Sequence, residues 1–287
     1  ATAGAAWVPE FLRYAAERRT PVDFVATHSY GVDGGFLDEK GQSDTKLSAN
    51  PDSVINDVKA VRAQIAASAF PNLPLYFTEW SSSYTPRDPV HDSYISAPYI
   101  LSRLKGVEGD VQGMSYWTYT DLFEEPGPQT KPFEGGFGLM TPQGVRKATW
   151  FAYKYLAELG DRELPTGDDQ SIAAIKGRTI QLLAWRGVLP DQPVSNRPFF
   201  SKVRVPARAA PIDMKVGGLK PGSYRVTVRR TGFRQNDAYT AYLEMGRPTV
   251  LTKAQLARLQ AATLDPLTTS TVRVHADGTA TLDLPMR

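Results

Sequence analysis

The chain has 287 residues, 33 basic and 30 acidic side chains, and a formal net charge of +3. It contains no cysteine, which excludes disulfides and thiolate metal sites, and no apolar run approaches the roughly 18 residues that a membrane span needs. Its basic residues are scattered, and the densest group, residues 225–234, alternates with valines like the wet face of a strand, so no nucleic-acid partner is expected.

The first 160 residues alternate between helical and strand patterns. The predicted elements are a helix over 6–18, a strand over 22–30, a Gly- and Asp-rich loop to residue 50, a helix carrying Val54, Val58, Val61 and Ile65, a strand ending at 79, a helix over 92–106, a strand over 111–119 and a helix over 145–158. Such alternation indicates a parallel sheet with helical crossovers, buried on both faces.

The second half changes character after a polar junction at residues 160–169. Short runs with β propensity follow, separated by Gly-containing turns, and their spacing predicts an antiparallel β-sandwich over 161–287. The predicted strands are 171–175, 179–186, 199–205, 212–216, 222–230, 270–275 and 279–284. One helix interrupts them at residues 253–262, with Thr252 as its cap.

Three parallel strands alone would leave the inner face and both edges of their sheet unpaired. A complete (β/α)8 barrel needs about 250 residues, whereas this chain supplies 160 before the predicted sandwich. The fold class predicted is therefore α/β plus all-β: residues 1–160 form the C-terminal part of a (β/α)8 TIM barrel, with strands six to eight, and a β-sandwich follows. We expect the chain to start inside the barrel; a small, open α/β layer domain is the alternative.

Glu79 ends an apolar strand and is flanked by Trp80 and a run of serines. Because chemistry in α/β barrels takes place at the C-terminal ends of the strands, this carboxylate is a candidate catalytic residue. A glycosidase nucleophile must be ionised, fixed and close to a ring carbon, which suits a carboxylate on a rigid strand. The alternative is a structural carboxylate that caps a helix or pairs with an arginine.

The neighbouring strand ends offer matching groups. His28 and Tyr30 lie two residues apart, so they share one face of their strand, and Trp117 could stack on a sugar ring; each could also be an ordinary core residue. Glu124 and Glu125, in the following loop, could accept hydrogen bonds from sugar hydroxyls or simply be solvated. No residue cluster has metal-ligand spacing, and the two remaining histidines, 91 and 275, are interpreted as surface residues.

Several segments together resemble glycoside hydrolase family 39, whose members include bacterial β-xylosidases and α-L-iduronidases. They are Asp23–Tyr30, Phe77–Ser81, Ser115–Glu125, Gly135–Leu139, Gly232–Tyr239 and Leu243–Pro248. The resemblance covers nearly the whole chain and is closest to the bacterial β-xylosidases.

The resemblance implies a retaining glycosidase that removes β-D-xylosyl units from xylo-oligosaccharides or aryl xylosides by double displacement. Glu79 would be the nucleophile, His28 and Tyr30 would contact the sugar or position Glu79, Trp117 would form a platform, and Glu124 and Glu125 would bind the distal hydroxyls. No cofactor or metal is implied.

One part of the family pattern is missing. The family's acid/base is a glutamate that follows an asparagine, and none of the asparagines here precedes a glutamate. We therefore expect that residue upstream of the chain, on a missing N-terminal barrel segment, and expect the chain alone to be inactive. An α-L-iduronidase, for which only Lys131 and Arg146 could bind the substrate carboxylate, an exopolysaccharide glycosidase and a non-catalytic carbohydrate-binding module remain alternatives. The sequence does not decide between the bacterial cytoplasm and periplasm.

Overall fold

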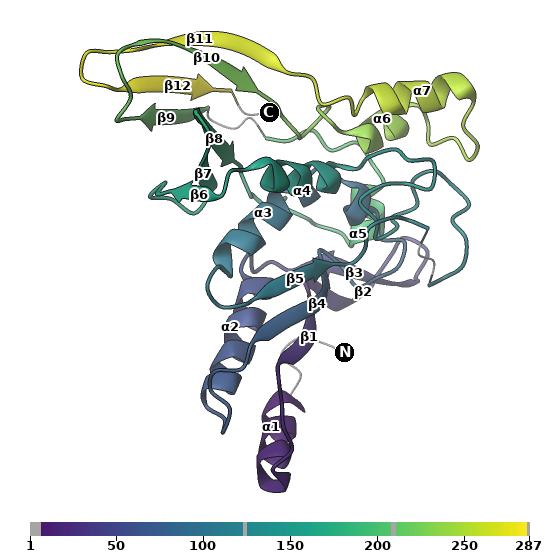
Figure 1. The fold of residues 1–287 in the computed structure, drawn as a ribbon. Coiled ribbons are helices and arrows are strands. Elements are labelled where there is room, and N and C mark those ends of the chain that lie inside the picture. The colour runs from purple at the N-terminus through teal and green to yellow at the C-terminus, as the bar shows by residue number, and fades with distance from the viewer. Residues whose placement is uncertain (1–6, 123–124, 208–210, 286–287) are drawn as a thin grey trace.

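The computed structural model describes residues 7–122, 125–207 and 211–285 (Figure 1). The elements of the first half are α1 (Trp7–Arg18), β1 (Val25–Tyr30), β2 (Val32–Leu37), β3 (Ser43–Leu47), α2 (Ser53–Ala66), β4 (Leu75–Ser81), the 3-10 helix η1 (Pro89–Asp92), α3 (Ser96–Gly106), β5 (Gly113–Tyr116) and α4 (Ala148–Glu158).

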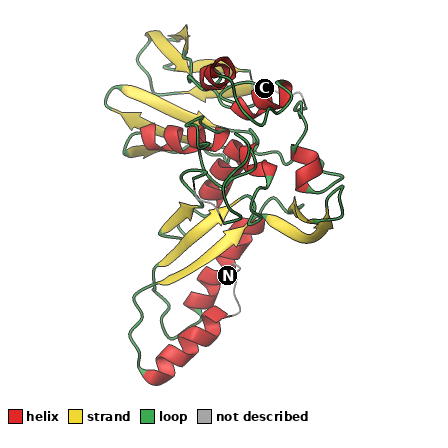
Figure 2. Cartoon of the chain, turned by 90° about the vertical axis from the view of Figure 1, so that its right-hand side faces the viewer, coloured by secondary structure: helices red, strands yellow, loops and turns green. Residues whose placement is uncertain are grey.

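A parallel sheet with the strand order β1–β4–β5 lies at the centre of this half (Figures 1 and 2). Along the chain a helix lies between each strand of this sheet and the next, and α1 contacts α2, α2 contacts β1 and α3, and α3 contacts α4. The predicted α/β alternation is therefore confirmed. The four apolar residues of α2 at helical spacing are all fully buried: Val54, Val58, Val61 and Ile65.

The two faces of the sheet differ in burial. Val25, Leu75 and Phe77 pack into one apolar cluster with residues of α1 and α2. On the other face Ala26, Tyr76 and Thr78 are exposed. The expectation that the strand ending near residue 79 is buried on both faces is thus wrong for the chain by itself, since only the helix-covered face is buried.

The segment predicted as a loop to residue 50 contains an antiparallel hairpin, β2–β3. The Ser48 N–H after this hairpin donates a hydrogen bond to Gly31 O, between β1 and β2, and β3 contacts α5 (Asn196–Phe200). The glycines at positions 34 and 35 obscure this hairpin in the sequence, because they interrupt the alternation of Val32 and Phe36 that would indicate a strand.

The second half consists of β6 (Arg162–Leu164), β7 (Ser171–Lys176), β8 (Thr179–Ala184), α5, β9 (Ile212–Val216), β10 (Gly222–Val228), α6 (Ala238–Glu244), α7 (Lys253–Ala261), β11 (Thr268–Val274) and β12 (Ala280–Leu284). In the described ranges these strands form an antiparallel β6–β7–β8 sheet and two antiparallel pairs, β10–β11 and β9–β12. Most predicted strands are present, and α7 begins after the predicted cap Thr252, which forms a capping box with Gln255.

The strand predicted over 199–205 is wrong. Residues 196–200 form helix α5, whose N-cap is Ser195 and whose first turn contains Pro198; both are helix-start signals. Phe199 and Phe200 are buried in a cluster that also includes Trp80 of β4 and Trp185. This core crosses the domain boundary predicted at residue 160.

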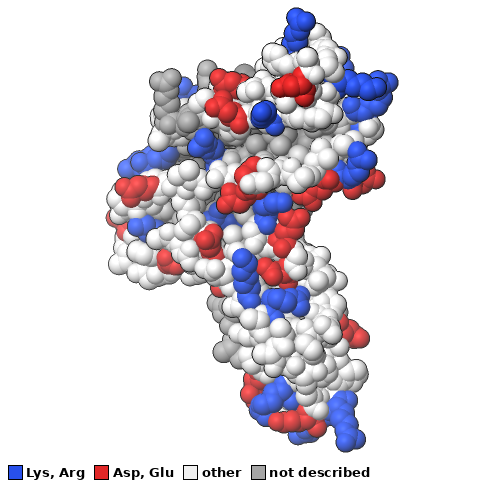
Figure 3. Space-filling view, turned by 90° about the vertical axis from the view of Figure 1, so that its left-hand side faces the viewer, with Lys and Arg blue, Asp and Glu red and all other residues white. Residues whose placement is uncertain are grey.

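Acidic and basic side chains are interspersed over the face drawn in Figure 3. Among the helices of the described ranges, none has the length and apolar character required to cross a bilayer.

Candidate active site

A bulge in β4 determines where Glu79 points. Thr27 of β1 pairs with Phe77, but the next residue, His28, pairs with Glu79, so Thr78 is an extra residue in β4. The pairing with β5 shifts at the same place. Without the bulge, Glu79 would lie on the same face as Phe77, against the helices; one extra residue reverses the alternation and places it on the open face beside His28.

Glu79 contacts both residues that the sequence analysis placed beside it. The Tyr30 hydroxyl donates a hydrogen bond of 2.7 Å to Glu79 Oε2, and His28 Nδ1 lies 3.3 Å from the same oxygen. The side chains of His28 and Glu79 are only about one quarter exposed, at 24% and 26%. Burial and the contact with Glu79 raise the pKa of Tyr30 far above its usual value, so the phenol keeps its proton and remains a donor.

Trp117 directly follows β5, and its backbone N–H donates a 3.0 Å hydrogen bond to Trp80 O. The indole is half-buried at the C-terminal end of the sheet, next to the strand that carries Glu79. Glu125 is exposed, and its charge contributes to the raised pKa of Tyr30, which places it within electrostatic reach of the Tyr30–Glu79 pair. Glu124 lies outside the described residues.

His91, interpreted as a surface residue from the sequence, is fully buried. Its Nδ1 lies 2.9 Å from Gly135 O and its Nε2 lies 3.0 Å from Ser83 O. The ring therefore connects the loop after β4 to the Gly-rich segment of the loop after β5. Gly135 has a φ of +75°, and an added Cβ would lie 2.4 Å from the backbone of Asp88, so only glycine fits there.

A buried ion triad, which the sequence analysis missed, anchors the same loop. Lys147 Nζ lies 2.6 Å from Asp92 Oδ1 and 2.7 Å from Asp121 Oδ2, and all three side chains are fully buried. The two carboxylates also accept hydrogen bonds of 2.7 Å from the backbone N–H groups of Gly135 and Gly138. The triad thus fixes both ends of the Gly-rich segment against the start of α4.

Burial and the mutual charges of the triad shift the pKa values of Asp92 and Lys147. Desolvation raises the pKa of Asp92 to about 6, although Lys147 opposes this shift. For Lys147, burial alone would lower the pKa, but the two carboxylates outweigh it and raise the value. In the described part of the chain, no group of three or more His, Cys, Asp or Glu side chains is arranged to hold a metal ion.

The geometry is that of a fixed carboxylate at the C-terminal end of a parallel sheet, with one strong hydrogen-bond donor and an imidazole beside it. Such a carboxylate can act as a nucleophile or stabilise a developing cation. Sequence alternation was sufficient to place His28 and Tyr30 on one face of their strand, because β1 is regular from Val25 to Tyr30.

Comparisons with known proteins place the chain among glycoside hydrolases. The chain is 37% identical over 185 residues to a β-xylosidase from Geobacillus stearothermophilus, which covers 64% of this chain and 36% of that protein. The crystal structure of the GH39 enzyme from Xanthomonas axonopodis pv. citri matches with a TM-score of 0.95 and 57% identity, over 99% of this chain and 56% of that one. A monomeric β-xylosidase from Caulobacter crescentus CB15 matches with a TM-score of 0.93 and 58% identity, over 99% and 57%.

The chain therefore spans between about a third and somewhat more than half of the length of these relatives. The family model for glycosyl hydrolases family 39 matches residues 1–281, almost the entire chain. The chain belongs to glycosyl hydrolases family 39.

Proposed function

We propose that the chain is the C-terminal part of a retaining β-xylosidase that removes β-D-xylosyl units from xylo-oligosaccharides. Residues 1–160 would supply the last three strands of a (β/α)8 barrel, and residues 161–287 a β-sandwich domain. The observation that carries the proposal is the Glu79 carboxylate, held by Tyr30 and His28 on the open face of a parallel sheet. The β-xylosidase relatives support the choice of sugar.

In the proposed mechanism Glu79 attacks the anomeric carbon of the xyloside and forms a covalent xylosyl-enzyme, while the leaving-group oxygen receives a proton from the acid/base. Water, deprotonated by the same acid/base, then attacks the anomeric carbon and releases xylose with retained configuration. Tyr30 and His28 would fix the orientation of Glu79, Trp117 would pack against the sugar ring, and Glu124 and Glu125 would accept hydrogen bonds from its distal hydroxyls.

The acid/base would come from an upstream segment that completes the barrel. An exposed apolar surface supports this assignment. Trp7 and Phe11 of α1 are 80% and 52% exposed, and Phe24, 53% exposed, contacts Tyr76 on the open face of the sheet. A soluble protein rarely exposes so many large aromatic side chains in one region unless another element covers them.

A mechanism-based label tests the proposed function directly. Full-length protein treated with a 2-fluoro-xyloside that carries a good leaving group should gain the mass of one fluoroxylosyl unit, and peptide mapping should place that unit on Glu79. Binding of xylose without any adduct would favour a carbohydrate-binding module instead. Turnover of an aryl α-L-iduronide in preference to the xyloside would favour the iduronidase alternative.

The 287-residue chain expressed alone should neither unfold cooperatively nor hydrolyse an aryl xyloside, because the exposed apolar face and the acid/base both need the upstream segment. The full-length protein should do both. Denaturation followed by circular dichroism and a chromogenic xyloside assay would measure this. Cooperative unfolding together with hydrolysis by a chain of verified 31.6 kDa mass would contradict the proposal.

Tyr30→Phe should lower kcat/KM for an aryl xyloside by roughly 10- to 100-fold, since a hydrogen bond to a charged group contributes about 1.5–3 kcal/mol. The aromatic ring is retained, so its edge-to-face packing on Tyr84, at 6.1 Å between centroids, should persist. Tyr224→Phe is a matched control, because that hydroxyl donates to Lys220 O on an exposed turn. Equal activity of Tyr30→Phe and wild type would exclude a role for the Tyr30 hydroxyl.

A further inference from the structure

The loop after β4 and the loop after β5 are connected by three residues of the first loop. His91 and Asp92 bind the carbonyl and the N–H of Gly135, as described above. The third residue is Arg87, which is not part of the proposed reaction. Glu79 precedes the first loop, and Glu125 lies in the second. These contacts therefore link the loop next to the proposed nucleophile to the loop that carries the proposed sugar-binding carboxylate.

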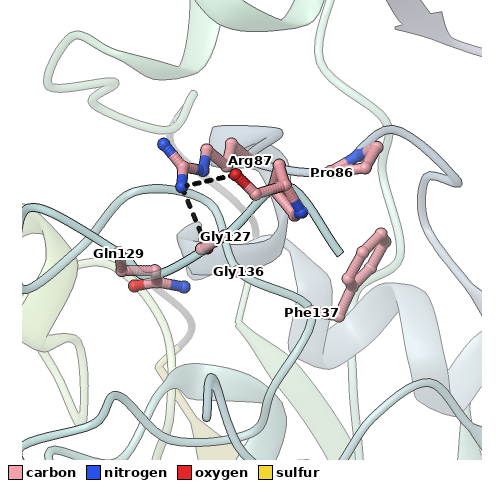
Figure 4. Close-up of a pocket in the computed structure, with 7 residues that line it drawn as sticks. Pro86, Arg87, Gly127, Gln129, Gly136 and Phe137 are labelled. Carbon is pink, nitrogen blue, oxygen red and sulfur yellow. Dashed lines mark hydrogen bonds between the residues drawn. The ribbon is translucent and has the colours of Figure 1, made fainter. Parts of the chain in front are cut away.

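The Arg87 guanidinium contacts two parts of the second loop, the backbone at 126–128 and the side chain of Glu134. Its Nη2 lies 3.4, 3.1 and 2.9 Å from the carbonyl oxygens of Pro126, Gly127 and Pro128. Its Nη1 lies 3.5 Å from Glu134 Oε1. Figure 4 shows the guanidinium directed at the backbone of Gly127, at the mouth of a small pocket. The pocket is lined by Pro86, Arg87, Pro126, Gly127, Gln129, Gly136 and Phe137.

Glu134 connects the Arg87 guanidinium to a further part of the second loop. Its carboxylate accepts hydrogen bonds of 2.8 and 3.0 Å from the backbone N–H and the hydroxyl of Thr130. The planar Arg87 side chain thus contacts the backbone at 126–128 directly and the turn at 130–134 through Glu134. A guanidinium suits this task better than an ammonium, because its donors have a fixed fork geometry.

The backbone of Arg87 has a φ of +58°. A residue other than glycine occupies this left-handed region at an energetic cost and remains there only where its surroundings fix it. The contacts of the guanidinium with the second loop are the surroundings that fix Arg87. The positive φ of Arg87 also suggests a test, because glycine at this position keeps the backbone conformation while it removes the guanidinium.

Glu125 directly precedes Pro126, whose carbonyl is the first that Arg87 reaches. The Glu125 side chain is exposed, so its position depends on the backbone that carries it. Pro126 and Pro128 have a fixed φ, and through them the contact with Arg87 would be transmitted to that backbone.

We propose that Arg87 is a positioning residue that fixes the Glu125 carboxylate against the distal hydroxyls of the xylosyl unit. The inference rests on the proposed function. Arg87 does not touch the sugar; it sets the distance between the sugar-binding carboxylate and Glu79 by clamping one loop to the other. Recognition of the distal hydroxyl therefore depends on Arg87, whereas attack on the anomeric carbon does not.

The test compares an aryl β-D-xyloside with its 4-deoxy analogue in the full-length protein. Arg87→Gly should lower kcat/KM for the xyloside by roughly 10- to 50-fold, mainly through KM, since a correctly placed hydrogen bond to a carboxylate is worth about this factor. The 4-deoxy substrate lacks the hydroxyl, so its kcat/KM should fall no more than about threefold. Arg87→Lys should recover part of the loss, because an ammonium can still reach one carbonyl.

Arg234→Gly is the matched control. Arg234 also has a positive φ, of +56°, and pairs with Glu244 in the second half of the chain. This variant should leave both substrates unchanged. An equal loss with both substrates in Arg87→Gly would mean a merely structural role, and no loss with either would mean no role; each result overturns the proposal.

Hydrogen exchange tests the contact of Arg87 with the second loop independently of the proposed function. In Arg87→Gly, amides of the peptide covering residues 125–134 should exchange faster than in the wild type, whatever the substrate is. Wild-type protein that fails to cleave xylosides would contradict the proposed function and the role in sugar recognition. Unchanged exchange in the variant would contradict the clamp itself, even if xylosides are cleaved.

Discussion

Glu79→Gln in the full-length protein is expected to reduce kcat for an aryl β-D-xyloside by roughly 10³- to 10⁶-fold, which is the range observed when a covalent nucleophile is removed. The amide is nearly isosteric but cannot attack the anomeric carbon. The fold should persist, because the amide oxygen can still accept the hydrogen bond from Tyr30, 2.7 Å away. Glu39→Gln, the same change on the exposed turn of the β2–β3 hairpin, should retain full activity.

The stereochemistry of rescue distinguishes a nucleophile from an acid/base. In Glu79→Ala, azide can enter the vacated space and attack the anomeric carbon; a C–N bond forms, the bond to the aryl oxygen breaks, and the product is the α-xylosyl azide. Nuclear magnetic resonance of the product identifies its configuration. The β-xylosyl azide would assign Glu79 to the acid/base role and contradict the proposed mechanism.

Lys147→Met should destabilise the protein by about 3–5 kcal/mol, because it leaves Asp92 and Asp121 buried without their cation. Reversible urea denaturation followed by tryptophan fluorescence would measure the change in the free energy of unfolding. The loss should be smaller at pH 5 than at pH 8. Burial raises the pKa of Asp92 to about 6 even beside Lys147, and loss of the cation removes a cause that lowers it, so Asp92 is protonated at pH 5 and carries no unpaired charge there.

Two control variants sharpen this result. Lys105→Met removes a lysine that pairs with the exposed Glu108, and it should cost no more than about 1 kcal/mol. Replacing Asp92 and Asp121 with asparagine in the Lys147→Met background should recover much of the lost stability, because amides still accept the hydrogen bonds of Gly135 and Gly138. A single Lys147→Met variant as stable as the wild type would show that the triad contributes nothing.

Periodicity was enough to predict the parallel α/β half of the fold. The four apolar residues of α2 recur at helical spacing and are buried, and β1 alternates regularly, so His28 and Tyr30 could be assigned to one face. The hairpin β2–β3 and helix α5 were missed for local reasons: glycines interrupt the first, and the apolar residues of the second read equally well as a strand.

The buried polar residues around the site could not be predicted for a different reason. Asp92, Asp121 and Lys147 are far apart in the sequence, and no spacing pattern links them. His91 gives no local signal either. Only the tertiary structure shows that these charges meet inside the protein, since pairing and burial depend on how the two loops fold over each other.

Because β4 contains an extra residue, the site depends on the number of residues in this strand as well as on their chemistry. Thr78 contributes no functional group to it, yet the direction of the Glu79 side chain depends on its presence. Two proteins with the same residue types at this strand end, but differing by one in length, would present their carboxylates to opposite sides of the sheet. Insertion or deletion of a single residue is therefore a route by which a strand end can gain or lose a reactive group while every side chain in the core keeps its identity.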